Sequence, residues 1–354
     1  IIYRLSMLDL VPDGNEWDEI VAQAKAVEQA GATIINTGIG WHEARIPTIA
    51  TMVPRAGFAW VTRKLKGAVN IPLVATNRIN TPDVAEGVLQ QGDADMVSMA
   101  RPLLADAEFV NKAAEGRADE INVCIACNQA CLDHAFSGET ASCLVNPRAC
   151  RETELNYAPA TRRKKLAVVG AGPAGLAFST VAAGRGHQVT LFEQADRIGG
   201  QFNMAKRIPG KEEFHETLAY FERQLELTGV DVRLGTTADA TMLAGFDEVV
   251  LATGVSPRTP EIEGLAHEKV LGYVDVLQGG APVGSRVAII GAGGIGFDVS
   301  EFLGREMPDG PEFPTPEAFA RQWGIDMSLQ ARGGVAGVDA EPEPLGREIW
   351  LLQR

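Results

Sequence analysis

The sequence predicts an α/β protein that joins half of a (β/α)8 barrel to two Rossmann-like folds. Three observations predict this architecture. Strand-like apolar runs alternate with amphipathic stretches before residue 117, four cysteines lie close together after it, and two glycine-rich motifs each follow a further apolar strand. At 354 residues the chain is long enough for two or three domains.

The first 117 residues carry the barrel pattern. Apolar runs at 2–8, 33–37, 73–76 and 96–99 are typical of strands, and the stretches 17–30 and 81–91 are typical of amphipathic helices. Alternating strands and helices predict a parallel sheet. Four such units make half of a barrel that takes ~250 residues, so we expect four more strands before Ile1. The strand pattern at the other end predicts that the chain also stops inside a domain.

Side chains at the carboxyl ends of barrel strands are the candidate site residues, because barrel chemistry takes place there. Arg101 opens a helix through Pro102, where its guanidinium and nearby N–H groups can hold a phosphate such as that of FMN. A surface arginine before an N1 proline fits the pattern equally well. His42 follows a strand in a polar loop and is either catalytic or structural. The positions selected in this way are Arg4, residues 36–45, Asn77, Arg78, Ala100 and Arg101.

Four of the five cysteines are gathered in one short segment, at Cys124, Cys127, Cys131 and Cys143. Three closely spaced cysteines and a more distant fourth favour a 4Fe-4S cluster over zinc, which prefers two paired knuckles. Unliganded thiols are the remaining alternative. Cys150 lies outside this spacing, and we expect it to be a small buried residue.

The first glycine motif follows the strand 166–169 and contains Gly170, Gly172 and Gly175. A helix and the strand 188–192 come next, and Glu193 ends that strand in the position of an acid that accepts from ribose hydroxyls. The part of a bound flavin nucleotide beyond the pyrophosphate would then pass the residues Gly199, Gly200 and Gln201. This arrangement favours FAD over NAD.

The second glycine motif follows the strand 286–290 and contains Gly291, Gly293 and Gly296. The next strand, 348–352, ends in Gln353 and Arg354, where an NAD enzyme would carry an acid. A cation at this position favours the 2′-phosphate of NADPH. Alternatively, Arg354 is an ordinary solvated residue at the end of the chain.

The net charge and the hydropathy of the sequence limit the classes of partner that the protein can bind. The net charge of −14 disfavours nucleic acids and anionic membranes, which an acidic protein repels. The sequence has no uncharged apolar run of the ~18 residues that a membrane span requires, and no secretory signal opens it. We therefore expect a cytoplasmic protein.

Taken together, these motifs closely resemble the bacterial 2,4-dienoyl-CoA reductases, a family of old-yellow-enzyme-like iron–sulfur flavoproteins. The resemblance covers the whole chain. It depends on residues 3–6, 36–45 and 98–102, the four-cysteine spacing and both glycine motifs.

The resemblance implies roles for individual residues. It places Arg4 at the flavin pyrimidine edge, and it places Arg78, Ala100, Arg101 and Gln129 beside FMN. It places Ala174, Glu193, Gln201 and Lys211 on FAD. His42 matches a histidine that assists proton donation by a tyrosine, and the position of that tyrosine lies before Ile1.

The implied activity is NADPH-dependent reduction of dienoyl-CoA in unsaturated fatty-acid β-oxidation. Electrons would pass from NADPH through FAD and the cluster to FMN. A trimethylamine dehydrogenase-like protein, an enoate reductase and an inactive electron-transfer fragment remain alternatives. We place the half barrel at 1–117, the cluster segment at 118–160 and the FAD domain at 161–282. A nested, incomplete NADPH domain follows at 283–354.

Overall fold

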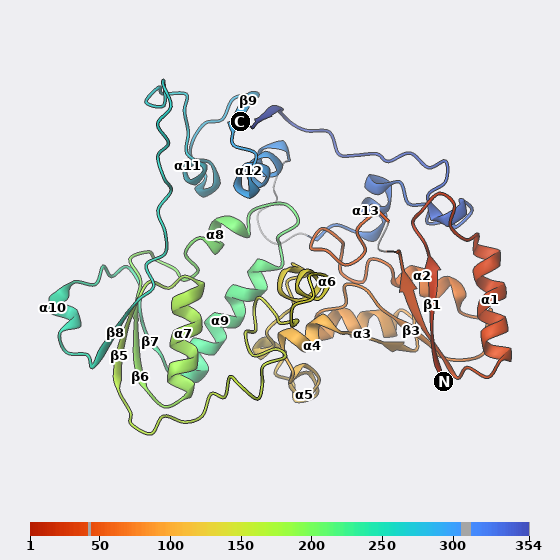
Figure 1. The fold of residues 1–354 in the computed structure, drawn as a ribbon, viewed down its shortest axis with the longest axis horizontal. Helices are drawn as coiled ribbons and strands as arrows, with labels where there is room; N and C mark the ends of the chain where they lie inside the picture. Colours follow the sequence, from red (N-terminus) through yellow and green to blue (C-terminus); the bar gives the residue numbers. More distant parts are fainter. Residues whose placement is uncertain (42–43, 306–312, 354) are drawn as a thin grey trace. The chain divides into compact units, whose positions relative to one another are not determined.

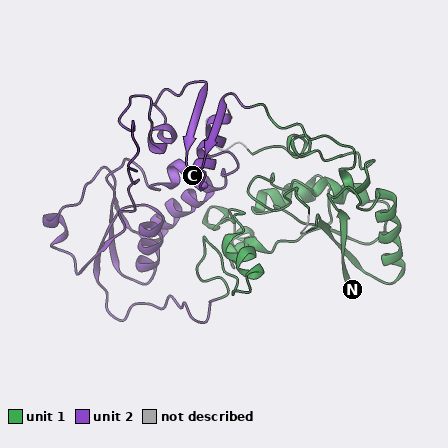
Figure 2. Cartoon of the chain, turned by 45° about the horizontal axis from the view of Figure 1, so that its top comes forward, with its two compact units in different colours: residues 1–150, 312–344 green, residues 151–311, 345–354 purple. Residues whose placement is uncertain are grey.

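The computed structural model describes residues 1–41, 44–305 and 313–353. The chain forms two compact units (Figure 2). The first contains residues 1–150 and 312–344, and the second contains residues 151–311 and 345–354.

The first unit contains the predicted parallel sheet. Among the described residues its strands lie in the order β1-β2-β3-β4, which is also their order along the chain. Helices follow the strands, as a (β/α)8 barrel requires, so the predicted half barrel is confirmed (Figure 1). The bounds of its elements are β1 (Ile2–Leu8), α1 (Trp17–Gln29), β2 (Ile34–Ile39), α2 (Ala59–Leu65), β3 (Leu73–Ala75), α3 (Pro82–Gln90) and β4 (Met96–Val97).

The helix starts of this unit follow from local sequence. Glu16 and Glu19 form a capping box at the start of α1, and Thr81 accepts a hydrogen bond from the Val84 amide at the start of α3. Pro82 occupies the first turn of α3, where its missing N–H costs nothing.

The cysteine segment follows the sheet and has little regular structure. Short helices and turns give it shape: α4 (Arg101–Ala105), α5 (Phe109–Ala114), the 3-10 turn Ala118–Glu120, the π-helical turn Gln129–Asp133 and α6 (His134–Phe136). Cys150 is exposed and has a left-handed φ of 61°, so the expectation that it is a small buried residue is wrong. Its side chain lies on a turn and not on an apolar face.

The second unit contains a parallel sheet in the order β7-β6-β5-β8 and a parallel pair of strands, β9 and β10. The helices α7 and α9 pack together beside the four-stranded sheet (Figure 1). The bounds are β5 (Lys165–Val169), α7 (Pro173–Gly184), β6 (Gln188–Phe192), α8 (Phe202–Ala205), α9 (Phe214–Thr228), β7 (Asp231–Arg233), α10 (Ala240–Leu243), β8 (Glu248–Leu251), α11 (Tyr273–Gln278), β9 (Arg286–Ile290), α12 (Gly294–Gly304) and β10 (Glu348–Leu352).

The segment between α12 and β10 does not fold with either of these elements. Residues 313–344 pack with the first unit, whereas the sequence analysis placed 283–354 in one NADPH domain. The apolar face of α13 (Pro316–Trp323) explains the difference, because Phe319 is 2% exposed and packs edge-to-face on Phe58. Gly333 then exchanges backbone hydrogen bonds with Leu10 and Asn15.

In the part of the chain that the structure describes, no helix combines the length and the apolar character needed to cross a membrane.

Candidate functional site

The four clustered cysteines lie around one pocket of the first unit. Arg101, at the start of α4, lines the same pocket. Cys124 and Cys127 lie in one loop, Cys131 lies in the π-helical turn that follows it directly, and Cys143 lies in the next loop. All four cysteines predicted as ligands therefore line the same pocket, although Cys143 lies further along the sequence than the other three.

Asparagine side chains tie the cysteine loops to their surroundings, and the sequence analysis missed them. Asn80, just after β3, donates to the Cys124 carbonyl at 2.9 Å. Arg101 donates to the Asn128 side-chain oxygen at 2.7 Å. Asn122 and Asn146 make similar contacts, described below. The sequence signal for these contacts was an asparagine within three residues of a cysteine: Asn122 before Cys124, Asn128 after Cys127 and Asn146 after Cys143.

Burial makes the thiolate forms unfavourable in this pocket. It raises the pKa of the Cys124 and Cys127 thiols, and it raises that of Cys143 to about 11. Burial lowers the pKa of Arg101, while its attraction to Cys124 opposes that change. A cationic metal centre would supply the missing positive charge, because metals bind the thiolate and not the thiol.

The donor set of the pocket consists of four cysteine sulfur atoms. No three His, Cys, Asp or Glu side chains of the described residues are close enough together to hold one metal ion. Soft sulfur donors are the ligands that zinc and iron–sulfur clusters take, so the residue types fit either group.

The barrel sheet carries further polar contacts. Arg4 on β1 donates to the Asn36 side-chain oxygen on β2 at 2.8 Å, and both residues lie within their strands and not at the carboxyl ends, where the sequence pattern had placed them. Beyond β3, Asn77 and Arg78 both have left-handed φ angles, of 72° and 57°, which are uncommon for residues other than glycine. Arg78 is 3% exposed, and its Nε donates to the Val53 carbonyl at 2.8 Å. Strained backbone of this kind clusters at functional sites.

Arg78 and Arg101 lie close enough to repel each other, and this repulsion also lowers the pKa of Arg101. Two neighbouring guanidinium groups favour an anion beside them. Ala100 is the residue before α4, and Gln129 is exposed at the start of the π-helical turn. These positions fit a phosphate-bearing ligand at the strand ends.

His42, the predicted catalytic residue, lies outside the described residues. Trp41 is described, and its indole N–H donates to Asp9 at 2.8 Å. Asp9 is 2% exposed and also accepts from Ser6 and Asn15. The sequence analysis did not single out Asp9, although its position just after β1 was the available signal.

The first glycine motif forms a tight loop between β5 and α7. Gly170 has a φ of 105°, and a side chain at Gly175 would meet the Gly170 carbonyl at 1.9 Å. At Gly172 the space is open, which leaves room for a ligand at the start of α7. Glu193 closes this loop by accepting from the amides of Ala171 and Ala195 at 2.7 and 2.9 Å.

The other FAD candidates lie around the same loop or beside it. Ala174 is the second residue of α7. Gln201 follows Gly200, whose Cα lies against the glycine loop, and donates to the Val255 carbonyl at 3.0 Å. Lys211 instead forms an ion pair with Asp298 on α12, with its Nζ 2.6 Å from one carboxylate oxygen.

The second glycine motif repeats this geometry. A side chain at Gly296 would also meet the carbonyl of the motif's first glycine, Gly291, at 1.9 Å. Gly170 donates to the Phe192 carbonyl, and Gly291 likewise donates to the Leu352 carbonyl. Gln353 therefore occupies the position that Glu193 holds in the first fold. Gly293 precedes α12 as Gly172 precedes α7. Arg354 lies outside the described residues.

Two family models match the chain in turn. Residues 1–120 match the NADH:flavin oxidoreductase / NADH oxidase family. Residues 133–241 and, in an overlapping match, 164–307 match the pyridine nucleotide-disulphide oxidoreductases. The chain joins a segment of the first family to a segment of the second.

Several known proteins are similar to this one over most of the chain. A metal reductase of Desulforamulus reducens is 41% identical over 86% of the chain and 46% of the relative. A cinnamate reductase of Clostridium sporogenes is 34% identical over 82% of the chain and 44% of the relative. The structure of a 2-naphthoyl-CoA reductase with 2-naphthoyl-CoA superposes with a TM-score of 0.82 and 34% identity, over 85% of the chain and 46% of that structure. The chain thus spans less than half the length of each.

Proposed function

We propose that the chain is the electron-transfer core of an NADPH-dependent flavoprotein that reduces a carbon–carbon double bond of an acyl-CoA thioester. The observation that carries the proposal is the pocket that Cys124, Cys127, Cys131 and Cys143 share with Arg101. Its residues span the junction between the flavin oxidoreductase match, which ends at residue 120, and the pyridine nucleotide-disulphide oxidoreductase match, which begins at residue 133. A one-electron carrier belongs between two flavins when electron pairs must be separated.

The four cysteines are proposed as the ligands of a 4Fe-4S cluster. When bound, the cluster supplies one-electron transfer and the flavins supply hydride chemistry. The chain's own residues shape this site: Arg101 contributes positive charge, Cys124 is buried, and the other three cysteines are partly buried. Zinc without labile sulfide in the purified protein would contradict the assignment.

The nucleotide sites are proposed from the two glycine loops and the barrel edge. At the edge, Arg78 and Arg101 would hold the FMN phosphate and Arg4 would face the pyrimidine. At the first loop, Gly172 leaves space for the FAD pyrophosphate, and Glu193 retains lone pairs for ribose hydroxyls. Lys211 would reach FAD only by leaving Asp298.

Preference for NADPH over NADH is supported by the position of Gln353. The amide stands where the first fold carries the Glu193 carboxylate, so no acid repels a 2′-phosphate there. We expect tighter binding of NADPH than of NADH. Equal dissociation constants for the two nucleotides would contradict this part of the proposal.

The proposed substrate is 2,4-dienoyl-CoA. The resemblance of the sequence motifs supports it, and so do relatives named for reduction of cinnamate and 2-naphthoyl-CoA. In all three compounds an unsaturated carbon framework is conjugated with a carboxyl-derived group. Such a group stabilises the negative charge that develops after hydride addition, and His42 is proposed to assist the following protonation.

Product analysis tests the substrate class. The purified protein is incubated anaerobically with NADPH and either 2,4-dienoyl-CoA or cinnamate, and in a separate reaction with trimethylamine and an oxidised redox dye in place of NADPH. We expect NADPH consumption and a reduced acyl-CoA with the first compound. Reduction of free cinnamate alone would indicate an enoate reductase, and oxidation of trimethylamine would indicate an amine dehydrogenase.

An electron-transfer module without its own substrate is the second candidate, because the described barrel sheet has four of the eight strands of a closed barrel. NADPH-driven reduction of a dye without turnover of dienoyl-CoA would favour it. Steady-state reduction of dienoyl-CoA would exclude it.

A further inference from the structure

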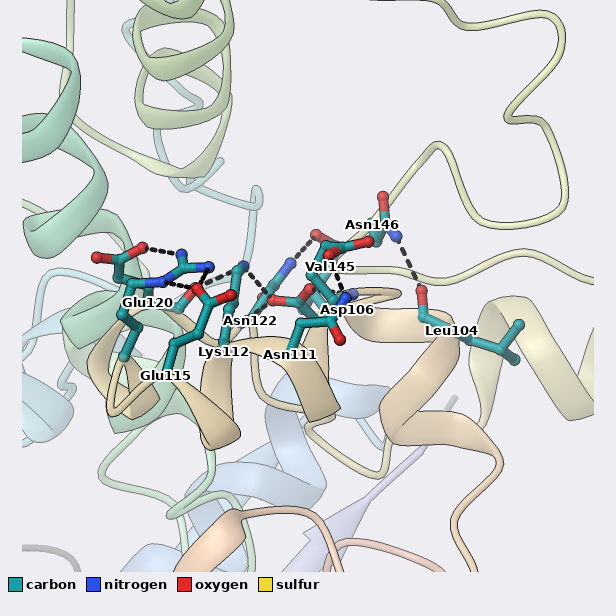
Figure 3. A network of polar contacts seen from close by, with 11 residues as sticks. Leu104, Asp106, Asn111, Lys112, Glu115, Glu120, Asn122, Val145 and Asn146 are labelled. Carbon is teal, nitrogen blue, oxygen red and sulfur yellow. Dashed lines mark hydrogen bonds and ion pairs between the residues drawn. The ribbon is translucent and has the colours of Figure 1, made fainter.

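A polar network around Asp106 (Figure 3) shares Leu104 and Val145 with the lining of the cysteine pocket. At its centre is Asp106, the residue that ends α4, with a side chain 8% exposed. Lys112 of α5 donates to it at 2.6 Å, and the Lys112 side chain is itself 16% exposed. Lys112 also donates to the Glu120 carbonyl at 2.9 Å. The ion pair thus fixes the chain on both sides of α5.

Asp106 holds the residue that leads into the first cysteine loop. The same carboxylate oxygen that accepts from Lys112 accepts from the Asn122 backbone amide at 2.9 Å. Asn122 lies two residues before Cys124 and is 7% exposed. The start of the three-cysteine loop is therefore attached to a buried ion pair.

The Asn122 side chain connects this loop to the loop of the fourth cysteine. Its Nδ2 donates to the Val145 carbonyl at 2.8 Å, two residues after Cys143. Asn146 then donates to the Leu104 carbonyl of α4 at 2.9 Å. Leu104 and Val145 both line the cysteine pocket. One asparagine thus links the two chain segments that carry the four thiols.

The hydrogen bond that the Asn122 side chain donates explains why this position carries an asparagine. Within the described parts of the chain its Oδ1 is buried without a hydrogen-bond partner. An unpaired buried oxygen is costly, and an apolar side chain at this position would avoid that cost. Packing alone therefore does not explain an asparagine here, whereas the bond to Val145 does.

We propose that Asn122, held by the Asp106–Lys112 pair, is a positioning residue that keeps the Cys143 loop beside the three-cysteine loop before a metal centre is bound. The inference rests on the proposed function of the four cysteines. Groups that orient metal ligands commonly change metal affinity 10–100-fold when they are replaced. Loops that are already in place also lose less conformational freedom on binding.

The test compares Asn122→Ala with Asn111→Ala in the purified protein. Asn111 is drawn in Figure 3 as well, but its side chain donates to Glu108, the residue before α5, and among the described residues it makes no side-chain hydrogen bond to either cysteine loop. Each protein is challenged with a chelator, and iron and labile sulfide are measured over time. We expect Asn122→Ala to release the centre at least ~10-fold faster than the wild type, and Asn111→Ala to release it at the wild-type rate.

Two further measurements separate the possible failures. Bound FAD and the unfolding temperature report whether each variant is folded, and Asn122→Leu, which fills the site without a donor or an unpaired polar atom, replaces Asn122→Ala if that variant does not fold. Wild-type protein with zinc and no sulfide would contradict the proposed cluster, and zinc release then provides the same comparison. Equal release from the wild type and a folded Asn122 variant would overturn the positioning role.

Discussion

Asp9 shows how a single buried carboxylate can shape a loop at a barrel edge. Burial would raise the pKa of Asp9, but hydrogen bonds from Asn15, Trp41 and Ser6 overcome this effect and lower it. These donors are neutral, so hydrogen bonds stabilise the charge, and no ion pair to Asp9 occurs among the residues that the structure describes. The residue connects the end of β1 to Trp41, which precedes the predicted catalytic position.

Replacing Asp9 with asparagine should destabilise the protein in a pH-dependent way. Because the folded-state pKa is lowered, the carboxylate contributes stability above its ordinary pKa of 3.8 and loses that contribution as the pH falls through the folded value. We expect Asp9→Asn to cost about 1–3 kcal/mol at pH 7, since an amide cannot accept from all the donors. The difference in unfolding free energy from the wild type should shrink towards pH 3. A difference that is the same at both pH values would disprove the role of the charge.

At the scale of elements, the two glycine loops share one steric rule. In each, the last glycine of the motif packs on the carbonyl of the first at a distance that excludes any side chain. This contact lets the helix begin next to the strand, so that its amide groups face a bound phosphate.

Gly175→Ala should therefore disrupt the first loop, because its methyl group would lie 1.9 Å from the Gly170 carbonyl. We expect loss of most bound FAD and destabilisation by at least ~1–3 kcal/mol, the usual range for overpacking. Gly184→Ala, in the same helix α7 and with no neighbouring atoms within 4 Å, is the matched control. It should keep FAD and raise stability by up to ~1 kcal/mol, since alanine favours helix. Flavin content and thermal unfolding measure both variants. Full FAD content in Gly175→Ala would refute the steric argument.

At the scale of the whole molecule, the chain leaves the second nucleotide fold between α12 and β10 and contributes α13 to the first unit. Phe319 joins the core of that unit, next to Phe58 and Trp323. Arg332 adds an ion pair with Glu16 and a bond to the Gly14 carbonyl at 2.9 Å. The half barrel therefore depends on residues far along the sequence.

Phe319→Ala should destabilise the first unit by ~3–5 kcal/mol, because it opens a cavity in a closed core. Hydrogen exchange locates the effect: amides of β1 and β2 should lose protection, while those of β5 and β6 keep it. Glu317→Gln, an exposed change in the same helix, is the control. Lost protection in β5 and β6 with none lost in β1 and β2 would show that α13 does not stabilise the half barrel.

The sequence by itself determined the four strands of the half barrel and the strand, glycine turn and helix that open each nucleotide fold, whereas α2, α9 and β7 were not predicted. Apolar periodicity is local, and the glycines of each motif are required by a turn that forms within a few residues, so neither depends on distant contacts. The cysteine spacing also predicted which four thiols line one pocket. The residues that form each of these features lie close together in the sequence, so local patterns are sufficient to predict them.

Only the tertiary structure decided the membership of residues 313–344, the partners of the asparagines and the exposure of Cys150. Phe319 meets Phe58 across more than 250 residues, and no local pattern reveals which core an amphipathic helix will enter. The same holds for Asn122: any loop asparagine can donate a hydrogen bond, and the fold alone brings the Val145 carbonyl to it. Contacts between segments far apart in sequence depend on global packing, which the residues of one segment do not encode.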